Sequence, residues 1–586
     1  MALVCNRLNP MTPRPDDRPT RRRSGTDEEL IGALRRLDGR TYGSYKSLIG
    51  DWDYGDFSLH IDHVQADPYA PPSTVRISAS PQRMGLPAEA LASTDARIAC
   101  ADFLARIFAE GITQFHSGAT LRIAKAEQEI LQRSSAIVTT DRVEIRFHVQ
   151  LPARGRTIMG HAGAQIFDED IPDLALHVFD FVSDSAPVTL KRQALIGHIH
   201  TYLDYRALQE ALVEYQWVAF VADGSILARR SGISQEPLED AVPFTSPESL
   251  RATVTLPYAG EVTGMALPPG VTVIVGGGYH GKSTLLSAIQ RGVYAHIPGD
   301  GRERVATVAA AMKVRAADGR SVTGVDVSPF ISHLPTGADT TRFSTPNASG
   351  STSQAAAIVE AIDLGCPLLL LDEDTSATNL LIRDSRMRQL VAAQREPITP
   401  LVDRVRSLAT ERSISTIMVM GGSGDYLDCA DRILMLDHYR CVDVTDQARE
   451  VTKLLPRPLL DLPAPTPAAP RIPVRSRGGT RQKTKAVGVD AVLLDKHTVD
   501  LSDIEQIVDS GQTEAIAWAM RLVLEHYADA RTPLPQLLDR LERAFASEGL
   551  DTLVKAGARS HSGSLVRPRR IDIGAAVNRY RALSLT

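Results

Sequence analysis

A glycine-rich octapeptide lies near the middle of the chain. Gly276–Ser283 reads Gly-Gly-Gly-Tyr-His-Gly-Lys-Ser and matches the pattern G-x-x-x-x-G-K-[ST]. It follows a β-branched run, Val271–Val275, and precedes Ser283–Arg291, whose apolar residues have helical spacing. A strand, a glycine-rich turn and a helix in this order predict an α/β fold. In such a fold the turn follows a strand of a parallel sheet, and its N–H groups point at phosphate oxygens beside the edge of that sheet.

The loop and the start of the following helix are expected to surround the phosphates of ATP. Lys282 would neutralise the β- and γ-phosphates, and the Ser283 hydroxyl would bind Mg²⁺. The helix N-terminus adds its positive dipole. The predicted contact residues are Gly276, Gly277, Gly278, Tyr279, His280, Gly281, Lys282, Ser283 and Thr284.

A second motif begins about ninety residues further along the chain. Pro367 is followed by four leucines, Leu368–Leu371, and then by Asp372 and Glu373. This run predicts a buried strand whose carboxyl end meets the phosphate loop. Asp372 is then expected to hold Mg²⁺ through water, and Glu373 to act as the general base on the attacking water.

The neighbours of the acidic pair resemble motifs of ABC ATPases. Asp372–Asn379 is similar to the Walker B and D-loop segment, usually D-E-P-T-S-A-L-D. About 22 residues earlier, Ala348–Gln354 occupies the place of the ABC signature, usually L-S-G-G-Q. The resemblance implies that Ser349, Gly350 and Ser351 also contact nucleotide.

The wider similarity is to a family of predicted soluble ABC-class ATPases that carry their own N-terminal domain. It runs from about residue 28 to the C-terminus, except 456–487. The segments that carry it are Tyr42–Lys46, His63–Pro68, Leu151–Arg156, Val221–Gly224, His296–Glu303, Asp326–Phe330, Glu396–Pro400, Pro568–Arg570 and Asn578–Arg581. The resemblance implies Mg²⁺-dependent hydrolysis of ATP to ADP and phosphate, and part of this family is associated with RNA.

Two positions depart from transporter-type ABC ATPases. Gly421–Asp425 stands where the switch histidine would fall, and Ser423 is the nearest polar candidate for its catalytic role. The Q-loop glutamine is also missing, and Asp326 or Ser328 stands near its place. The resembled family shares both departures, which suggest slow hydrolysis suited to a switch.

The predicted architecture is an α/β ABC-type P-loop ATPase core with an α+β N-terminal domain and a small, mainly helical C-terminal domain. The expected regions are a disordered tail (1–27), the N-terminal domain (28–250), the ATPase domain (251–455), a Pro-rich basic linker (456–487) and the C-terminal domain (488–586).

Local patterns predict individual elements. Thr94–Glu110 has helical spacing, with Ser93 or Thr94 as N-cap and Gly111 just past its end. Val143–Leu151 alternates as a half-buried strand does. A helix is expected from Ser502, with Glu505 completing a capping box. Further buried strands are predicted at Leu368–Leu371, Ile414–Met420 and Ile433–Leu436.

Composition narrows the cellular setting. The net charge of −5 argues against a wholly basic nucleic-acid coat but allows a local basic patch. Five scattered cysteines without a C-x-x-C pair favour a reducing compartment. The apolar run Cys366–Leu371 is far shorter than the roughly 20 residues of a membrane helix. We therefore expect a soluble cytoplasmic protein, with an organelle matrix as the alternative if the Arg-rich tail is a transit peptide.

Two partners are predicted. One is a second copy of the chain, because ABC sites are completed by the signature of a facing domain and this chain has a single signature-like segment. The other is single-stranded RNA, since basic residues gather without acids in the linker. They are Arg471, Arg475, Arg477, Arg481, Lys483 and Lys485.

Other interpretations stay open at this point. A DNA-maintenance ATPase and an ATP-gated interaction protein with little turnover are alternatives to RNA action. The arginines Arg567–Arg570 could bind nucleic acid or be solvated. Tyr42 and Tyr45 could stack on bases or be packed, and Arg154–Arg156 could bind phosphate or form a turn.

Overall fold

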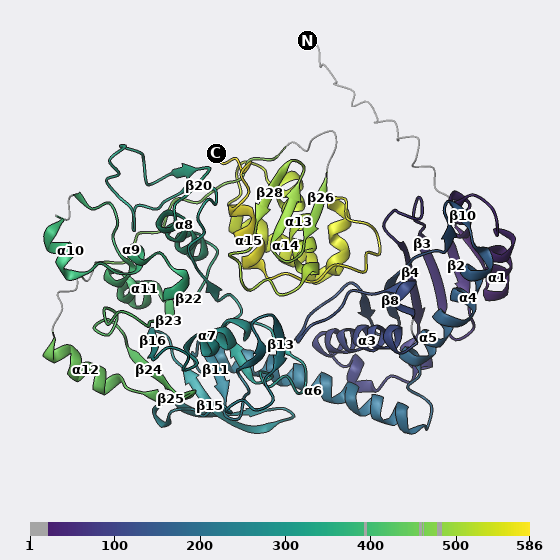
Figure 1. Cartoon of the computed structure of the whole chain (residues 1–586), viewed down its shortest axis with the longest axis horizontal. Helices are drawn as coiled ribbons and strands as arrows, with labels where there is room; N and C mark the ends of the chain where they lie inside the picture. The colour runs from purple at the N-terminus through teal and green to yellow at the C-terminus, as the bar shows by residue number, and fades with distance from the viewer. Residues whose placement is uncertain (1–21, 116, 392–394, 456–459, 461, 477–482) are drawn as a thin grey trace, which may run out of the picture. The chain divides into compact units, whose positions relative to one another are not determined.

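A computed structural model describes residues 22–115, 117–391, 395–455, 460, 462–476 and 483–586 (Figure 1). Its contacts divide the chain into two units. The first comprises the described residues up to Met84, with Ile107–Ile123 and Asp141–Asp180. The second comprises Gly85–Arg106, Ala124–Thr140 and Phe181–Thr586.

The first unit is built on a mixed sheet in the order β1-β2-β3-β4-β8-β5. Only the β1–β2 pair is parallel in this path. The strands are β1 (Arg23–Thr26), β2 (Gly50–Asp53), β3 (Ser58–His63), β4 (Ser73–Ala79), β5 (Leu121–Arg122) and β8 (Val143–Val149). The helices are α1 (Asp27–Arg36), α2 (Pro81–Met84), α4 (Gly160–Gln165) and α5 (Ile171–Phe179), and β9 (Ala153–Arg154) pairs with β10 (Thr157–Ile158).

The predicted disordered tail is wrong for residues 22–27. Arg22 forms ion pairs with Asp51 and Asp62, and Arg23–Thr26 is the parallel strand β1. Thr26 then caps α1 in a capping box with Glu29. Charged side chains that looked like those of a solvated tail therefore have specific partners, and residues 1–21 of the predicted tail lie outside the described residues.

The strand β8 is buried on both faces, not half-buried as predicted. Its polar positions Glu144 and Arg146 are 0% and 1% exposed. Arg146 donates to Glu144 at 2.7 Å, and Arg76 of β4 donates to the same carboxylate at 2.8 Å. Arg146 keeps the pKa of Glu144 at about 2 despite burial. Because the charged side chains are paired with one another, a strand of alternating apolar and polar residues can be buried on both faces.

In the N-terminal region, the end of one predicted helix is wrong, and the packed alternative for two tyrosines is confirmed. Helix α3 spans Thr94–Gln114 and passes Gly111, where a Cβ would lie 2.7 Å from Leu174 Cδ2. Gly111 thus allows close packing and does not end the helix. Tyr42 and Tyr45 are 3% and 0% exposed and form an edge-to-face pair, so they are not available to bases.

The second unit contains the predicted α/β sheet, in the order β19-β22-β23-β16-β24-β25. The pairs from β19 to β24 are parallel, and β25 is antiparallel to β24. The strands are β16 (Val271–Gly276), β19 (Met312–Lys313), β22 (Leu368–Asp372), β23 (Ser415–Val419), β24 (Arg432–Asp437) and β25 (Arg440–Asp443). The strands predicted at Val271, Leu368, Ile414 and Ile433 are confirmed.

Helices, a second sheet and smaller strand pairs complete this unit. The helices are α6 (Ala186–Glu214), α7 (Lys282–Arg291), α8 (Gly350–Asp363), α9 (Thr378–Leu381), α10 (Ser385–Leu390), α11 (Val405–Arg412) and α12 (Thr445–Leu454). A second, antiparallel sheet has the order β14-β15-β11-β18, with strands Arg251–Leu256, Gly260–Leu267, Ala219–Ala222 and Val305–Thr307. The small pairs are β6 (Glu129–Ile130) with β17 (Ala295–His296), β12 (Arg229–Ser231) with β13 (Ser234–Pro237), and β20 (Val322–Val325) with β21 (Phe343–Thr345). The further short strand β7 spans Ala136–Val138.

The C-terminal domain combines helices with a three-stranded antiparallel sheet (green to yellow in Figure 1). It consists of β26 (Thr484–Val487), β27 (Ala491–Leu494), β28 (His497–Asp500), α13 (Ser510–Arg521), α14 (Leu534–Glu548) and α15 (Arg570–Asn578). The helix predicted from Ser502 is wrong: α13 begins at Ser510, and Asp509 and Gln512 form its capping box. Glu505 instead forms ion pairs with Lys313 and Arg315.

Buried and half-buried ion pairs lie where α8 meets the C-terminal domain. We call three of them the arginine seam: Arg320–Glu360 within the ATPase domain, Arg579–Asp503 within the C-terminal domain, and Arg471–Asp363. Arg471 also donates to Asn578 Oδ1 at 3.0 Å and so links α8 to α15. Burial opposes charge, yet Arg579 holds the pKa of Asp503 below its ordinary value. Apolar residues pack closely at the same contact: a Cβ on Gly574 of α15 would lie 2.5 Å from Cδ2 of Leu364, which follows α8.

The described part of the predicted linker is fixed to its surroundings. We call residues 462–476 the strap. Arg404 and Arg412 donate to the carbonyls of Pro463 and Pro465, and the N–H of Val474 donates to Ser584 O at 2.9 Å. Arg471 belongs to the seam, and Arg475 donates to the carbonyls of Ala528 and His526. Two of the six basic residues assigned to RNA are therefore structural, and Arg477 and Arg481 lie outside the described residues.

Within the described ranges, no helix is both long enough and apolar enough to cross a lipid bilayer.

Candidate nucleotide-binding site

The glycine-rich loop connects the sheet directly to a helix, as the sequence predicted. β16 ends at Gly276, and α7 begins at Lys282 with Gly281 as its N-cap. Gly276 has φ 137°, and a Cβ there would lie 2.3 Å from Leu436 O. Gly281 has φ 98°. Both glycines are thus required by the backbone, because a side chain at either position would be strained or would clash.

Tyr279 is an exception inside this loop. Its φ is 64°, in the left-handed region that glycine prefers, and its side chain is 99% exposed. Tyr279, a predicted contact residue, therefore extends into solvent from the tip of the loop. Its side chain gains no burial that would offset the unfavourable positive φ.

Lys282 is held over the loop by backbone carbonyls. Its ammonium donates to Gly276 O and Gly277 O, both at 2.8 Å. Carbonyl partners neutralise none of its charge. The side chain can therefore exchange them for phosphate oxygens, which form stronger charge-assisted hydrogen bonds. Ser283 is exposed beside it, at the first turn of α7.

The predicted acidic pair lies at the same edge of the sheet. β22 ends at Asp372, which is in register with Val419 of β23, and Val419 is in register with Ile274 of β16. Asp372 is 6% exposed and accepts the N–H of Asp374 at 3.2 Å. Parallel strands thus bring Asp372 and Glu373 to the edge where the phosphate loop begins.

Glu373 is oriented by two backbone amides that sequence reasoning missed. Its Oε2 accepts the N–H of Gly421 and, at 2.8 Å, that of Gly422. A Cβ on Gly422 would lie 3.1 Å from Glu373 Oε1. The successive glycines are the signal in the sequence that could have revealed this role. A Cβ on Gly422 would crowd the carboxylate, whereas one on Gly421 would lie 3.7 Å from Glu373 Oε2, an ordinary contact distance.

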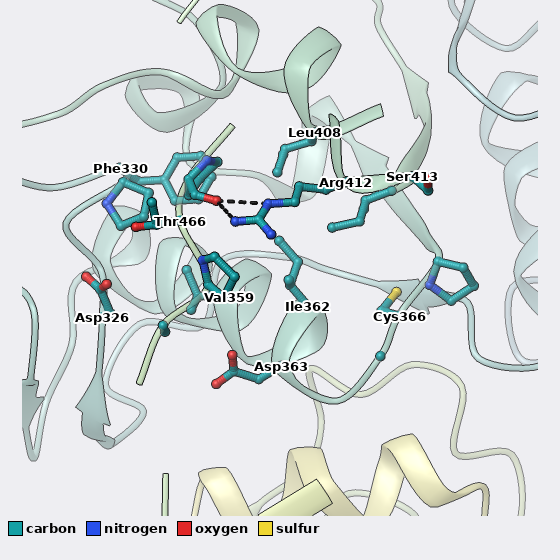
Figure 2. A pocket seen from close by; sticks show the side chains of 17 residues that line it. Asp326, Phe330, Val359, Ile362, Asp363, Cys366, Leu408, Arg412, Ser413 and Thr466 are labelled. Atoms are coloured by element: carbon teal, nitrogen blue, oxygen red, sulfur yellow. Dashed lines mark hydrogen bonds between the residues drawn. The ribbon is translucent and has the colours of Figure 1, made fainter. Parts of the chain in front are cut away.

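The polar substitutes for the switch histidine and the Q-loop glutamine have local partners. Ser423 Oγ accepts the N–H of Asp425 at 3.2 Å. Asp326 accepts both the N–H and the hydroxyl of Ser328. Asp326 also borders a cavity of about 470 Å³ between α8, α11 and the strap, where Arg412 is directed at the carbonyl of Pro465 (Figure 2). Contacts of Ser423, Asp326 or Ser328 with γ-phosphate remain predictions.

The signature-like segment forms the start of α8. Ser349 is the N-cap and is exposed, and Ser351 Oγ is 2.6 Å from Asn379 Oδ1. Gln354 connects the helix to the segment after the acidic pair: it donates to Ser376 Oγ and accepts the N–H of Ala377. In the described part of the chain, no hydrogen bond or ion pair joins Ser349–Ser351 to the phosphate loop.

Family models match three successive parts of the chain. Residues 27–180 match the N-terminal region of ATPases of the ABC class, residues 191–464 match the P-loop domain of the ABC ATPases, and residues 483–586 match the MRB1590 C-terminal domain. The chain belongs to the ABC-class ATPases. The resemblance and the fold class inferred from the sequence are thereby confirmed.

This ABC-class ATPase shares only limited sequence identity with the individual proteins that it resembles. It is 28% identical over 256 residues to the uncharacterised protein MJ1628 of Methanocaldococcus jannaschii. That match covers 42% of this chain and 56% of MJ1628, so the chain spans about half the length of this relative. CbiO1 of Clostridium perfringens, described as part of the ABC transporter complex cbiONQ, aligns at 14% identity over 41% of this chain and 97% of its own, with a TM-score of 0.24.

Proposed function

We propose that this ABC-class ATPase binds MgATP at Gly276–Ser283 and hydrolyses it to ADP and phosphate. The observation that carries this proposal is the fixed carboxylate of Glu373 at the sheet edge that also bears the phosphate loop. The two amides bind Oε2, and within the described residues Oε1 accepts no hydrogen bond. Oε1 is thus available to accept a proton from a water molecule that attacks γ-phosphate.

The remaining groups would bind and orient the nucleotide. Lys282 would leave its carbonyls for phosphate oxygens, and the N-terminus of α7 would add its dipole. Ser283 and Asp372 offer a hydroxyl and a carboxylate, the oxygen donors that Mg²⁺ prefers, with Asp372 acting through water. Bound Mg²⁺ would stabilise the negative charge that develops on the phosphates.

Replacing Glu373 with glutamine tests the proposed general base. Turnover should fall by about 10²- to 10⁴-fold, because the amide cannot accept a proton, while MgATP binding should persist. Phosphate release and calorimetric titration of full-length protein would measure the two effects. Asp374→Asn is the matched control, since it changes the adjacent, exposed acid and should leave turnover intact. Wild-type turnover in Glu373→Gln would contradict the assignment.

We further propose a head-to-tail homodimer in which Ser349–Ser351 of each copy meets the nucleotide of the other. The support is the exposed N-terminus of α8 and its lack of a connection to the loop of its own chain. Light scattering of Glu373→Gln with MgATP should give twice the monomer mass. Turnover by a wild-type protein that stays monomeric in the same conditions would refute this arrangement.

The partner is proposed to be single-stranded RNA, supported by the match of the C-terminal domain and by lysines on its sheet. Lys483 and Lys485 lie two residues apart along β26 and its approach, and Lys496 lies in the β27–β28 turn; all three are exposed. Their replacement by serine should flatten the salt dependence of RNA binding by about 2 in log–log slope. Lys453→Ser, on α12, is the control. Absence of salt-sensitive binding by the wild type would favour the alternative of an interaction switch with little turnover.

A further inference from the structure

The cavity in Figure 2, of about 470 Å³, lies within the second unit. Its lining residues come from α8, α11, the strap, the segment 326–330 and the turns that lead into β22 and β23. None of these lining residues belongs to the phosphate loop, the acidic pair or the segment 421–425. The cavity is therefore separate from the candidate nucleotide site, and its volume is in the range of pockets that hold small organic molecules.

The middle of the cavity is apolar. Phe330 and Leu408 are 0% and 1% exposed, and Val359 of α8 is buried as well. Ile362, almost one turn further along α8, is half-buried. These side chains would take the apolar part of a ligand out of water, which favours the binding of small molecules in such pockets.

The strap forms one wall of the cavity. Arg412 extends from the end of α11 and donates to the carbonyl of Pro465, with Nε at 3.0 Å and with a second guanidinium nitrogen. Pro465 and Pro467 restrict the backbone on both sides of Thr466, so this wall is formed before any ligand binds. The charge of Arg412 is directed at the strap, and the carboxylates of the cavity lie on its other side (Figure 2).

These carboxylates are Asp326 and Asp363, and only one of them has a cation partner. Asp363 pairs with Arg471 at 3.2 Å. Asp326 accepts the N–H and the hydroxyl of Ser328 through Oδ1. Among the described residues, Oδ2 of Asp326 accepts no hydrogen bond and no cation pairs with this carboxylate. Burial raises the pKa of Asp363, and the negative charges of Glu360 and Asp326 act in the same direction. This side of the cavity therefore lacks one positive charge.

We propose that the cavity binds a small organic cation, an amine on an apolar body, whose positive group pairs with Asp326. The apolar body would lie on Val359, Ile362 and Leu408, beside the strap. A metal ion does not fit, because the described residues of the cavity contain no cluster of three side chains that could hold one. The inference goes beyond the proposed function, since it does not require ATP to bind.

The test compares two probes of similar shape in full-length protein. 2-Phenylethylamine carries a positive charge, and 2-phenylethanol does not. The amine should bind roughly 10- to 150-fold more tightly, the value of a hydrogen bond to a charged group. Titration calorimetry measures the two affinities, and methyl NMR of Ile362 and Leu408 should show that both signals shift with the amine.

Three variants separate charge from shape. Asp326→Asn should remove the preference for the amine, because the amide oxygen can still accept from Ser328 but carries no charge. Asp446→Asn changes a surface acid of α12 and should keep the preference. Ile362→Phe fills the cavity and should weaken both probes together.

Equal affinity of the wild type for the two probes would overturn the inference, and so would a failure to bind the amine at millimolar concentration. An amine preference that survives in a folded Asp326→Asn variant would do the same. If Asp326→Asn did not fold, the wild-type NMR experiment would still decide, because binding without shifts at Ile362 and Leu408 would mean that the amine binds elsewhere.

Discussion

The nucleotide edge of the sheet and the arginine seam hold charged side chains in opposite ways. At the edge, the hydrogen-bond partners of Lys282 among the described residues are backbone carbonyls, and those of the Glu373 carboxylate are backbone amides. At the seam, each buried arginine meets a carboxylate, as Arg320 does with Glu360. A charge held by the backbone stays uncompensated and ready for a ligand, whereas a charge paired with its opposite is already used by the fold.

This difference explains why an arginine-rich string in a sequence does not by itself indicate a nucleic-acid surface. Arg567 donates to Glu542, Arg569 to Asp572 and Arg570 to Asp539, so the basic string near the C-terminus is paired within the chain. The nucleic-acid interpretation of Arg567–Arg570 loses its support, and the lysines of the C-terminal sheet take its place. Counting positive charges in a sequence does not reveal which of them have partners.

The largest effect is expected from the edge. Lys282→Ala should weaken MgATP binding by about 10²- to 10⁴-fold, because two or more charge-assisted hydrogen bonds to phosphate are lost. The unfolding midpoint without nucleotide should hardly change, since only hydrogen bonds to two accessible carbonyls disappear. Titration calorimetry and thermal unfolding measure the two quantities. Unchanged ATP affinity would mean that the lysine does not face the phosphates.

The seam should respond in the reverse manner. Glu360→Gln leaves Arg320 buried without a counter-charge and should cost about 3–5 kcal/mol of unfolding free energy. At low temperature, the folded protein should still bind MgATP like the wild type. Denaturant unfolding measures the loss, and Glu450→Gln is the control because that glutamate pairs with Lys453 on the surface. Equal stability of the two variants would show that the seam is no more important than a surface ion pair.

A smaller effect is expected where a single methyl group is added beside the clamped carboxylate. Gly422→Ala places a Cβ 3.1 Å from Glu373 Oε1, so the carboxylate must shift by a few tenths of an ångström. Turnover should fall about tenfold with ATP affinity retained, because catalysis is sensitive to such displacements. In Gly424→Ala the nearest atom is Leu427 Cδ1 at 3.5 Å, which is ordinary contact, and turnover should persist. Equal turnover of both variants would contradict a role for the clamp in positioning.

Sequence patterns predicted the sheet well because its strands are continuous apolar runs between turn residues. Leu368–Leu371 and Val271–Val275 could hardly be anything other than buried strands next to their motifs. The patterns failed where long-range pairing changed the environment of polar residues. The pattern predicts that Glu144 faces solvent, but Arg76, 68 residues away in the sequence, pairs with it in the core. In the same way, Arg471 has the position of a linker charge in the sequence, but it pairs with Asp363.

In the candidate site, too, local motifs could be predicted from the sequence, whereas contacts between distant segments could not. The loop, Lys282 and the acidic pair follow local motifs, so their positions could be predicted from order along the chain. The amides of Gly421 and Gly422 carry no side chain to recognise, and the approach of Tyr439 to Gly281 depends on the register between β16 and β24. Such contacts through the backbone or between distant strands leave little trace in a single sequence.

The smallest expected effect concerns the strap, whose bonds resemble those of the edge because they also join a charge to a backbone carbonyl. Arg412 donates to Pro465 O with Nε at 3.0 Å and with a second guanidinium nitrogen, across the cavity in Figure 2. Arg412→Met keeps most of the apolar stem and removes these bonds, which should cost about 1–2 kcal/mol locally. Because the strap is also anchored by Arg404 and Arg471, only the stretch around Pro465–Ala468 should loosen. Limited proteolysis should cut this stretch faster than in the wild type, while the unfolding midpoint and MgATP affinity stay nearly unchanged. If ATP affinity fell as well, the strap would be coupled to the nucleotide edge, and the separation between the two regions would have to be abandoned.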